Sequence, residues 1–171
     1  YAVSKIAGIK MIQAYRSQYN FKGISLMPTN LYGPGDNYDL ETSHVLPALI
    51  RKFHEAKINN ASEVVIWGTG KPHREFLYID DFADAALLLM KKYDSDDIIN
   101  VGTGKDISIG ELADIVRDVV GFSGEIVYDS SKPDGTPRKL LDISRLKDLG
   151  WEPATNLRQG ISKSYQSYLS K

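Results

Sequence analysis

The chain has 171 residues and a formal net charge of -1; 42% of its residues are hydrophobic and 25% are charged. This length suits one compact domain, and the composition fits neither disorder nor a general affinity for nucleic acids. No apolar run approaches the roughly 20 residues of a membrane-spanning helix, so a soluble, cytoplasmic protein is expected.

The first residues, YAVSK, predict the start of a helix. Apolar and polar residues alternate with a period near 3.6 over residues 1–19, as in an amphipathic helix. Tyr1 and Lys5 are four apart and therefore lie on one face of it. No initiating Met and no capping residue precede this pattern, which is typical of a segment from inside a larger protein. A C-terminal fragment is expected.

The rest of the chain alternates strands and helices. Residues 23–28 predict a strand ended by Pro28, and residues 30–38 predict a polar loop. Further strands are expected at 63–67, 75–79, 98–101 and 125–129. One further helix is expected to begin at a Ser43 cap and run through Phe53, and another to begin at a capping box of Ser108 and Glu111 and end near residue 120. Three more are expected at 82–93, at 144–149 and from about 157. This order predicts an α/β fold with a largely parallel sheet.

Two patterns argue against other functions. The Gly102-x-Gly104 sequence follows a predicted strand, but Ile107 stands where the dinucleotide fingerprint needs its third glycine, so a simple connection is favoured. The chain has no cysteine, and its His, Asp and Glu residues do not have the spacing of metal ligands. No metal site is expected.

Several motifs together resemble the extended short-chain dehydrogenase/reductase family. Its catalytic Tyr-x-x-x-Lys helix is followed by a strand and an Asn-x-Tyr-Gly-Pro loop, as in MPTNLYGPGDN (27–37) here. The stretches TSHVLPALIRKFHEA (42–56), VVIWGTGKPHREF (64–76) and SKPDGTPRKLLDISRL (131–146) are similar to the branch that makes GDP-L-fucose from GDP-4-keto-6-deoxy-D-mannose. That branch epimerises two carbons and then reduces the keto group with NADPH. The resemblance covers essentially the whole chain.

The resemblance implies a division into two domains. Residues 1–32 would be the C-terminal remnant of an NADP-binding Rossmann-type parallel sheet domain. Residues 33–171 would be mainly a smaller, mixed α/β sugar-nucleotide-binding domain, with about 80–101 packing back on the Rossmann domain. The family's glycine-rich loop, catalytic serine and catalytic cysteine precede the tyrosine and are absent here, so the isolated chain is expected to be inactive. The Tyr-x-x-x-Lys helix implies a homodimer.

The resemblance also implies roles for individual residues. The catalytic residues would be Tyr1, Lys5 and His44; a lysine one turn away stabilises a phenolate, and an imidazole can protonate a carbon next to a ketone. The NADP-binding residues would be Lys5, Pro28, Thr29, Asn30, Leu31 and His44. The residues that hold the GDP-sugar would be Lys52, Trp67, Arg74 and Asp134, with Arg138 and Lys139 as weaker candidates.

Each of these residues has a structural alternative. In the structural interpretation, Tyr1 and Lys5 are an ordinary surface pair. His44 is then a helix cap or a surface imidazole, and Trp67 is a core side chain. In the same interpretation, Arg74 is a surface arginine beside Glu75, and Asp134 is part of an ordinary Asp-Gly turn. His54 and His73 are interpreted as structural. For the whole protein, another nucleotide-sugar epimerase or dehydratase remains open; for the isolated chain, a non-catalytic GDP-sugar-binding module remains open.

Overall fold

The computed structural model describes residues 1–170. Its helices, in chain order, are α1 (Ala2–Tyr19), α2 (Val45–Ile58), α3 (Ile79–Lys92), α4 (Ile109–Val120), α5 (Ser144–Asp148) and α6 (Leu157–Leu169). Its strands are β1 (Ser25–Pro28), β2 (Asn30–Tyr32), β3 (Glu63–Trp67), β4 (His73–Tyr78), β5 (Ile98–Val101), β6 (Asp106–Ser108), β7 (Glu125–Asp129) and β8 (Arg138–Lys139).

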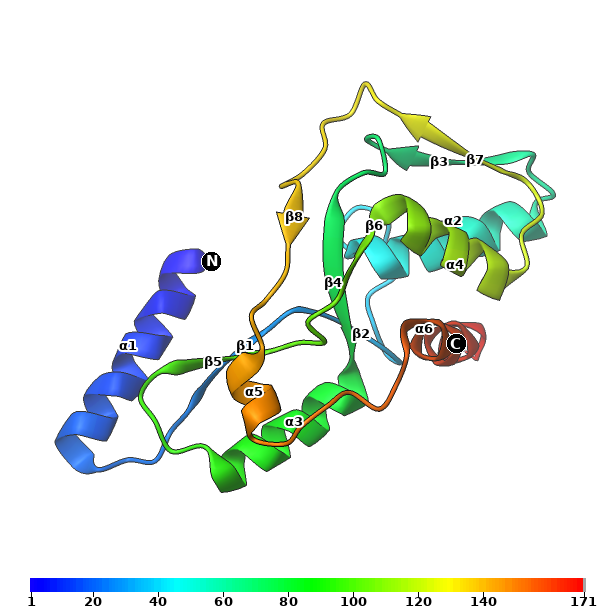
Figure 1. Ribbon diagram of the computed structural model, residues 1–171. Helices are drawn as coiled ribbons and strands as arrows, with labels where there is room; N and C mark the ends of the chain where they lie inside the picture. Colours follow the sequence, from blue (N-terminus) through cyan, green and yellow to red (C-terminus); the bar gives the residue numbers. More distant parts are fainter. Residues whose placement is uncertain (171) are drawn as a thin grey trace.

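The strands pair mostly in parallel. β1 pairs with β5, β2 and β8 pair with β4, and β3 pairs with β7, all in parallel, whereas β6 pairs with β4 in the antiparallel direction. These pairs form three short sheets, and β4 runs through the centre of the molecule between the regions that carry the other two (Figure 1). The predicted α/β fold with largely parallel pairing is confirmed.

Two hydrophobic clusters form the core. The first cluster lies among α2, α4, α6 and the strands beside them, and contains Phe53, Ile50 and Val116. The second lies around α3, β5 and α5, and contains Leu89, Ile99 and Leu146. Burying such side chains supplies the main driving force for folding. The partly buried Leu26 of β1, the strand that pairs with β5, also packs against the second cluster.

Helix α1 stands at one side of the molecule and buries none of its residues (Figure 1). It makes polar contacts with the segments around β1 and β5. The Gln13 side chain donates to the Asp96 carbonyl (2.9 Å), and Arg16 donates to the Gly23 carbonyl (2.9 Å) and to the Asp94 carboxylate (2.5 Å).

Some predicted boundaries were wrong. Residues 30–32, expected in a loop, form β2, and the two short strands β6 and β8 were not predicted. Ser43 does not cap α2; His44 is the N-cap residue, and the Ser43 hydroxyl is buried with no hydrogen-bond partner among the described residues. Helix α3 begins three residues earlier than expected. The capping box of Ser108 and Glu111 is confirmed.

The Gly102-x-Gly104 sequence has a structural role. It connects β5 to β6, and the N–H groups of Thr103 (2.6 Å) and Gly104 (2.7 Å) donate to the fully buried Glu75 carboxylate. The Leu141 N–H donates to its other oxygen (3.0 Å). A Cβ atom at position 102 would lie 2.3 Å from Glu75 Oε1, so only glycine fits. The loop therefore lies around a buried acidic side chain and supplies the hydrogen-bond donors that a buried polar group needs.

Candidate functional site

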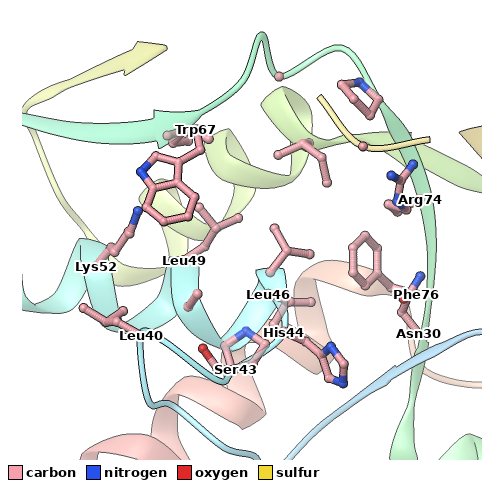
Figure 2. Close-up of a pocket in the computed structure, with 18 of the residues that line it drawn as sticks. Asn30, Leu40, Ser43, His44, Leu46, Leu49, Lys52, Trp67, Arg74 and Phe76 are labelled. Carbon is pink, nitrogen blue, oxygen red and sulfur yellow. The ribbon is translucent and has the colours of Figure 1, made fainter. Parts of the chain in front are cut away.

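A cavity of about 850 Å³ lies between the start of α2, the end of β3, Arg74 and Phe76 of β4, and the loop before β8 (Figure 2). Segments far apart in the sequence meet there. Its lining contains seven of the residues singled out from the sequence: Asn30, Leu31, His44, Lys52, Trp67, Arg74 and Asp134. Its volume is within the range of small-molecule sites.

Arg74 lies half-buried on β4 and faces the cavity. Its Nη1 donates to the carbonyls of His73 (2.7 Å) and Thr136 (2.6 Å). Among the described residues, Nε and Nη2 have no hydrogen-bond partner. One part of the guanidinium group is therefore fixed by the protein, and the other donors remain available to an anion such as a diphosphate.

Trp67 ends β3 with 67% of its surface exposed. The Nζ atoms of Lys52 and Lys132 lie 5.5 and 5.6 Å from the centres of its rings. Partial burial lowers the pKa of Lys52, and its Nζ donates to the Val65 carbonyl (3.2 Å). The structural alternative for Trp67, a core side chain, is wrong. The indole and Lys52 instead form a cationic, aromatic wall on one side of the cavity (Figure 2), and Lys132 lies over the same indole.

Asp134 lies in the loop before β8 and reaches the turn after β3. Its carboxylate accepts hydrogen bonds from the Thr69 N–H (2.8 Å) and the Thr69 hydroxyl (2.6 Å), and these bonds lower the pKa of Asp134. Gly68 has a φ of +80°, and a Cβ atom there would lie 2.3 Å from Asp134 Oδ1. Asp134 is thus ionised and joins two loops at the rim of the cavity. Sequence reasoning missed Thr69, although its place in a Gly-Thr-Gly turn opposite an Asp-Gly pair was a usable signal.

His44 is exposed on the side of the cavity where Asn30 also lies (Figure 2). Its carbonyl accepts from the Ala48 N–H (3.0 Å), but its side chain makes no capping bond. The imidazole is therefore free to meet a ligand in the cavity.

The segment from Pro28 to Leu31 lies at the carboxyl end of β1. The Thr29 hydroxyl (3.1 Å) and the Asn30 amide (2.7 Å) both donate to the Glu75 carbonyl, which fixes the segment against β4. Pro28, Thr29 and Asn30 line a second hollow of about 400 Å³, together with Lys139, and Asn30 also lines the main cavity. A hollow outside the carboxyl end of a parallel strand is where open α/β sheets bind dinucleotides.

Tyr1 and Lys5 are placed differently. The Lys5 Nζ lies 5.2 Å from the centre of the Tyr1 ring, so the two side chains do share one face of α1. Both are exposed, and neither lines the cavity. The structure brings them to each other but not to the other candidate residues.

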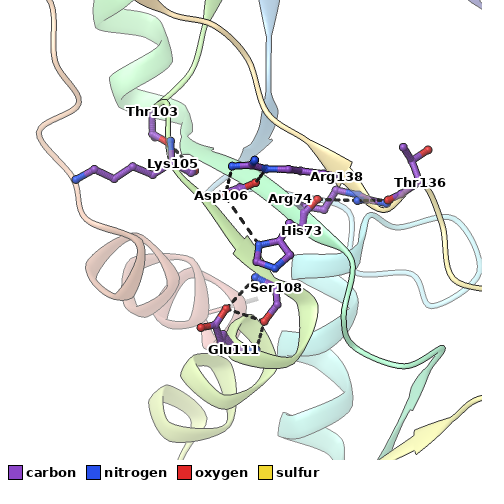
Figure 3. A network of polar contacts seen from close by, with 9 residues as sticks. All are labelled: His73, Arg74, Thr103, Lys105, Asp106, Ser108, Glu111, Thr136 and Arg138. Atoms are coloured by element: carbon purple, nitrogen blue, oxygen red, sulfur yellow. Dashed lines mark hydrogen bonds and ion pairs between the residues drawn. The ribbon is translucent and has the colours of Figure 1, made fainter.

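Arg138, a weaker candidate, and the two histidines interpreted as structural do not line the main cavity. Arg138 pairs with Asp106 of β6 (Figure 3). His54 Nδ1 lies 3.0 Å from the Tyr165 hydroxyl. His73 Nδ1 lies 3.9 Å from the Asp106 carboxylate.

No three His, Cys, Asp or Glu side chains within residues 1–170 are grouped so that they could hold a metal ion. Over the same residues, no helix has the length and apolar character needed to cross a membrane.

Comparison with known proteins gives consistent matches. The chain is 59% identical over 170 residues to GDP-L-fucose synthase from Sinorhizobium fredii, covering 99% of this chain and 54% of that protein. It is 57% identical over 169 residues to GDP-L-fucose synthase 1 from Arabidopsis thaliana, covering 99% and 52%. A crystal structure of a GDP-L-fucose synthetase from Naegleria fowleri bound to NADP matches with a TM-score of 0.93 and 33% identity, covering 99% and 55%.

The chain spans about half the length of the curated relatives it matches. A family model described as the NAD dependent epimerase/dehydratase family matches residues 1–102. The chain therefore belongs to the NAD dependent epimerase/dehydratase family.

Proposed function

We propose that this chain supplies the sugar-nucleotide site, and part of the catalytic machinery, of a GDP-L-fucose synthase. The observation that carries the proposal is the convergence of Lys52, Trp67, Arg74 and Asp134 on one cavity. The similarity to relatives of that name supports it. The substrate would be GDP-4-keto-6-deoxy-D-mannose and the product GDP-L-fucose.

The cavity provides groups that suit a nucleoside diphosphate sugar. Arg74 would bind diphosphate oxygens through the donors that the protein leaves unpaired. Lys52 would add a second positive charge beside Trp67, and the exposed indole would contact the base or the sugar. Asp134 would accept hydrogen bonds from the ligand while it holds Thr69.

His44 is proposed as an acid in the epimerisation. A carbon next to a ketone loses a proton readily because the resulting charge spreads onto oxygen. Inverting that carbon requires a proton to be delivered on the opposite face, and an exposed imidazole at the cavity is suited to do so.

Tyr1 and Lys5 are proposed to act in the reduction. Tyr1 would donate its hydroxyl proton to the C4 oxygen, and the Lys5 ammonium group, 5.2 Å from the ring centre, would stabilise the phenolate left behind. NADPH, when bound, supplies the hydride. Lys5, His44 and the segment from Pro28 to Leu31 would hold its nicotinamide end.

The domain division is proposed in the same terms: residues 1–32 as part of an NADP-binding domain, and residues 33–171 as mainly the sugar-nucleotide domain. The pairing of β1 with β5 supports a return of residues 80–101 to the first domain.

The exposed apolar side chains Val3, Ile6 and Met11 on α1 support a homodimer through this helix. A cytoplasmic location is proposed because the substrates are sugar nucleotides.

A second candidate is a GDP-sugar-binding module that performs no catalysis as an isolated chain. The exposure of Tyr1 and Lys5, away from the cavity, favours it. Another nucleotide-sugar epimerase or dehydratase is the alternative for the whole protein, and the base of the bound nucleotide distinguishes it.

The test is calorimetric titration of the chain with GDP and with UDP, followed by an assay of NADPH oxidation with GDP-4-keto-6-deoxy-D-mannose. We expect GDP to bind more tightly than UDP and the chain alone to show no turnover. Tighter binding of UDP would overturn the GDP assignment. Turnover by the chain alone would overturn the module interpretation.

A further inference from the structure

Arg138 and Asp106 form an ion pair outside the cavity (Figure 3). Arg138 Nε donates to Asp106 Oδ2, and Nη2 lies 3.3 Å from Oδ1, so the guanidinium group contacts both carboxylate oxygens. The Asp106 side chain is only 12% exposed, whereas that of Arg138 is 63% exposed. A two-point pair with a shielded partner fixes geometry better than a simple surface pair.

The pair connects strands on the two sides of β4. His73 of β4 is in register with Arg138 of β8, and Glu75 of β4 is in register with Asp106 of β6. Strand β8 has only two residues, so few backbone hydrogen bonds hold it. The Arg138 side chain reaches past β4 and ties this short strand to β6.

The loop before β8 is thereby held at two points. At one end, Asp134 accepts two hydrogen bonds from Thr69. At the other end, the His73 N–H donates to the Pro137 carbonyl (2.8 Å), next to Arg138. Thr136 lies between these points, and its carbonyl accepts a hydrogen bond from Arg74 Nη1 (2.6 Å).

This arrangement makes the Arg74 guanidinium depend on the loop. A Cβ atom at Gly135 would lie 2.9 Å from Arg74 Nη2, so the loop backbone passes directly over the group. A shift of Thr136 would release one of the two carbonyls that fix Nη1. The donors that face the cavity would then lose their defined direction.

We propose that Arg138 and Asp106 are positioning residues for nucleotide binding, acting through Thr136 on Arg74. The inference rests on the proposed function, because it assumes that Arg74 binds the diphosphate of the ligand. Neither residue contacts the ligand itself. Their effect is on affinity for the diphosphate and not on the proton transfers of His44 or Tyr1.

The experiment is calorimetric titration with GDP of the protein and of the variants Arg138→Gln and Asp106→Asn. We expect each variant to weaken GDP binding about fivefold or more, because residues in contact within one hydrogen-bond network usually affect one another's interaction free energies. Arg145→Gln is the matched control, because Arg145 is 62% exposed and pairs with Asp97 (3.1 Å) away from the cavity. It should bind GDP like the unchanged protein.

A double-mutant cycle separates positioning from general damage. In an Arg74→Ala background, where the group to be positioned is gone, Arg138→Gln should cause no further loss of GDP affinity. Arg138→Lys keeps the charge without the two-point contact, and should restore only part of the affinity. Thermal denaturation of each variant reports whether the fold is retained.

The outcomes are distinct. Failure of the unchanged protein to bind GDP would overturn the proposed function and the inference with it. GDP binding that is unchanged in Arg138→Gln and Asp106→Asn would overturn the inference alone. An equal loss in the presence and absence of Arg74 would also overturn it, because the pair would then act through another part of the molecule.

Discussion

Arg74 and Tyr1 are both proposed to touch the substrate, yet the chain holds them in opposite ways. Arg74 is on the central strand β4, and backbone carbonyls from two segments fix its guanidinium group. Tyr1 is 96% exposed at the start of α1, a helix that buries none of its residues. The chain builds the cavity from its own contacts, but it does not by itself define where Tyr1 and Lys5 point.

The difference follows from how each region is stabilised. The cavity lies beside the first hydrophobic cluster, and side chains packed around a core have few alternative positions. Helix α1 buries none of its residues, and its hydrogen bonds from Gln13 to the Asp96 carbonyl and from Arg16 to the Asp94 carboxylate are solvent-exposed. Exposed polar contacts contribute little free energy. We therefore expect the two regions to respond very differently to substitution.

The largest effect is expected in the first cluster. Phe53 is fully buried on α2, so Phe53→Ala should lower the free energy of unfolding by about 3–5 kcal/mol. Gln18→Ala, at an exposed residue of α1 outside the proposed dimer surface, should change it by less than about 0.5 kcal/mol. Urea denaturation monitored by circular dichroism measures both. Similar losses in the two variants would contradict the contrast between the regions.

The next largest effect is on ligand binding. Arg74→Ala should weaken GDP binding by about 1.5–3 kcal/mol, the usual cost of losing hydrogen bonds to a charged group. Tyr1→Phe should leave GDP affinity unchanged, since Tyr1 does not line the cavity. Calorimetry provides the affinities. If Tyr1→Phe weakened binding as much as Arg74→Ala, the division of roles between the regions would be wrong.

A smaller effect is expected at the turn after β3. Gly68→Ala places a Cβ atom against Asp134 at a residue with a φ of +80°, which should cost about 1–2 kcal/mol from the backbone plus the clash. Gly35 has a φ of +79° and open space around it, so Gly35→Ala carries the backbone cost alone. The difference in melting temperature between the two variants isolates the contact. Equal melting temperatures would show that Asp134 does not constrain the turn.

The smallest expected effect is the pH dependence of the stability that Asp134 contributes. The hydrogen bonds from Thr69 lower the pKa of Asp134 below that of an unfolded aspartate, so their stabilising contribution is complete above about pH 4. It should be lost as the pH falls through the folded pKa. Thr69→Val removes the hydroxyl donor and should move the pKa of Asp134 upward. NMR titration of the Asp134 carboxyl carbon measures the shift, and an unchanged midpoint in Thr69→Val would refute this assignment.

Much of the fold was predictable from local patterns. The strands 63–67, 98–101 and 125–129 and the Ser108/Glu111 capping box were predicted correctly, because alternation and capping are properties of neighbouring residues. Strands β6 and β8 were missed because each exists only through pairing with β4, more than 25 residues away in the sequence. Local signals carry no information about such partners.

The candidate site residues were predictable from the family resemblance and not from local patterns. The family resemblance identified Lys52, Trp67, Arg74 and Asp134, and the structure brings all of them to one cavity. Residue type alone suggested that Trp67 is a core side chain, which is wrong because β3 lies in a two-stranded sheet that leaves its end exposed. The contacts of Thr69 and Thr136 join loops 60 or more residues apart, so the turn motifs around Thr69 and Asp134 could indicate two turns but not that these turns are partners.

The most direct test of the central claim is an NMR titration with GDP that follows both tryptophan indole N–H signals. Trp67 lies at the cavity, whereas Trp151 is 3% exposed in the second cluster and donates to Asp84 (3.0 Å). We predict that the Trp67 signal shifts until GDP saturates the site while the Trp151 signal stays in place. A stationary Trp67 signal, or equal shifts of both, would contradict the assignment of this cavity as the nucleotide site.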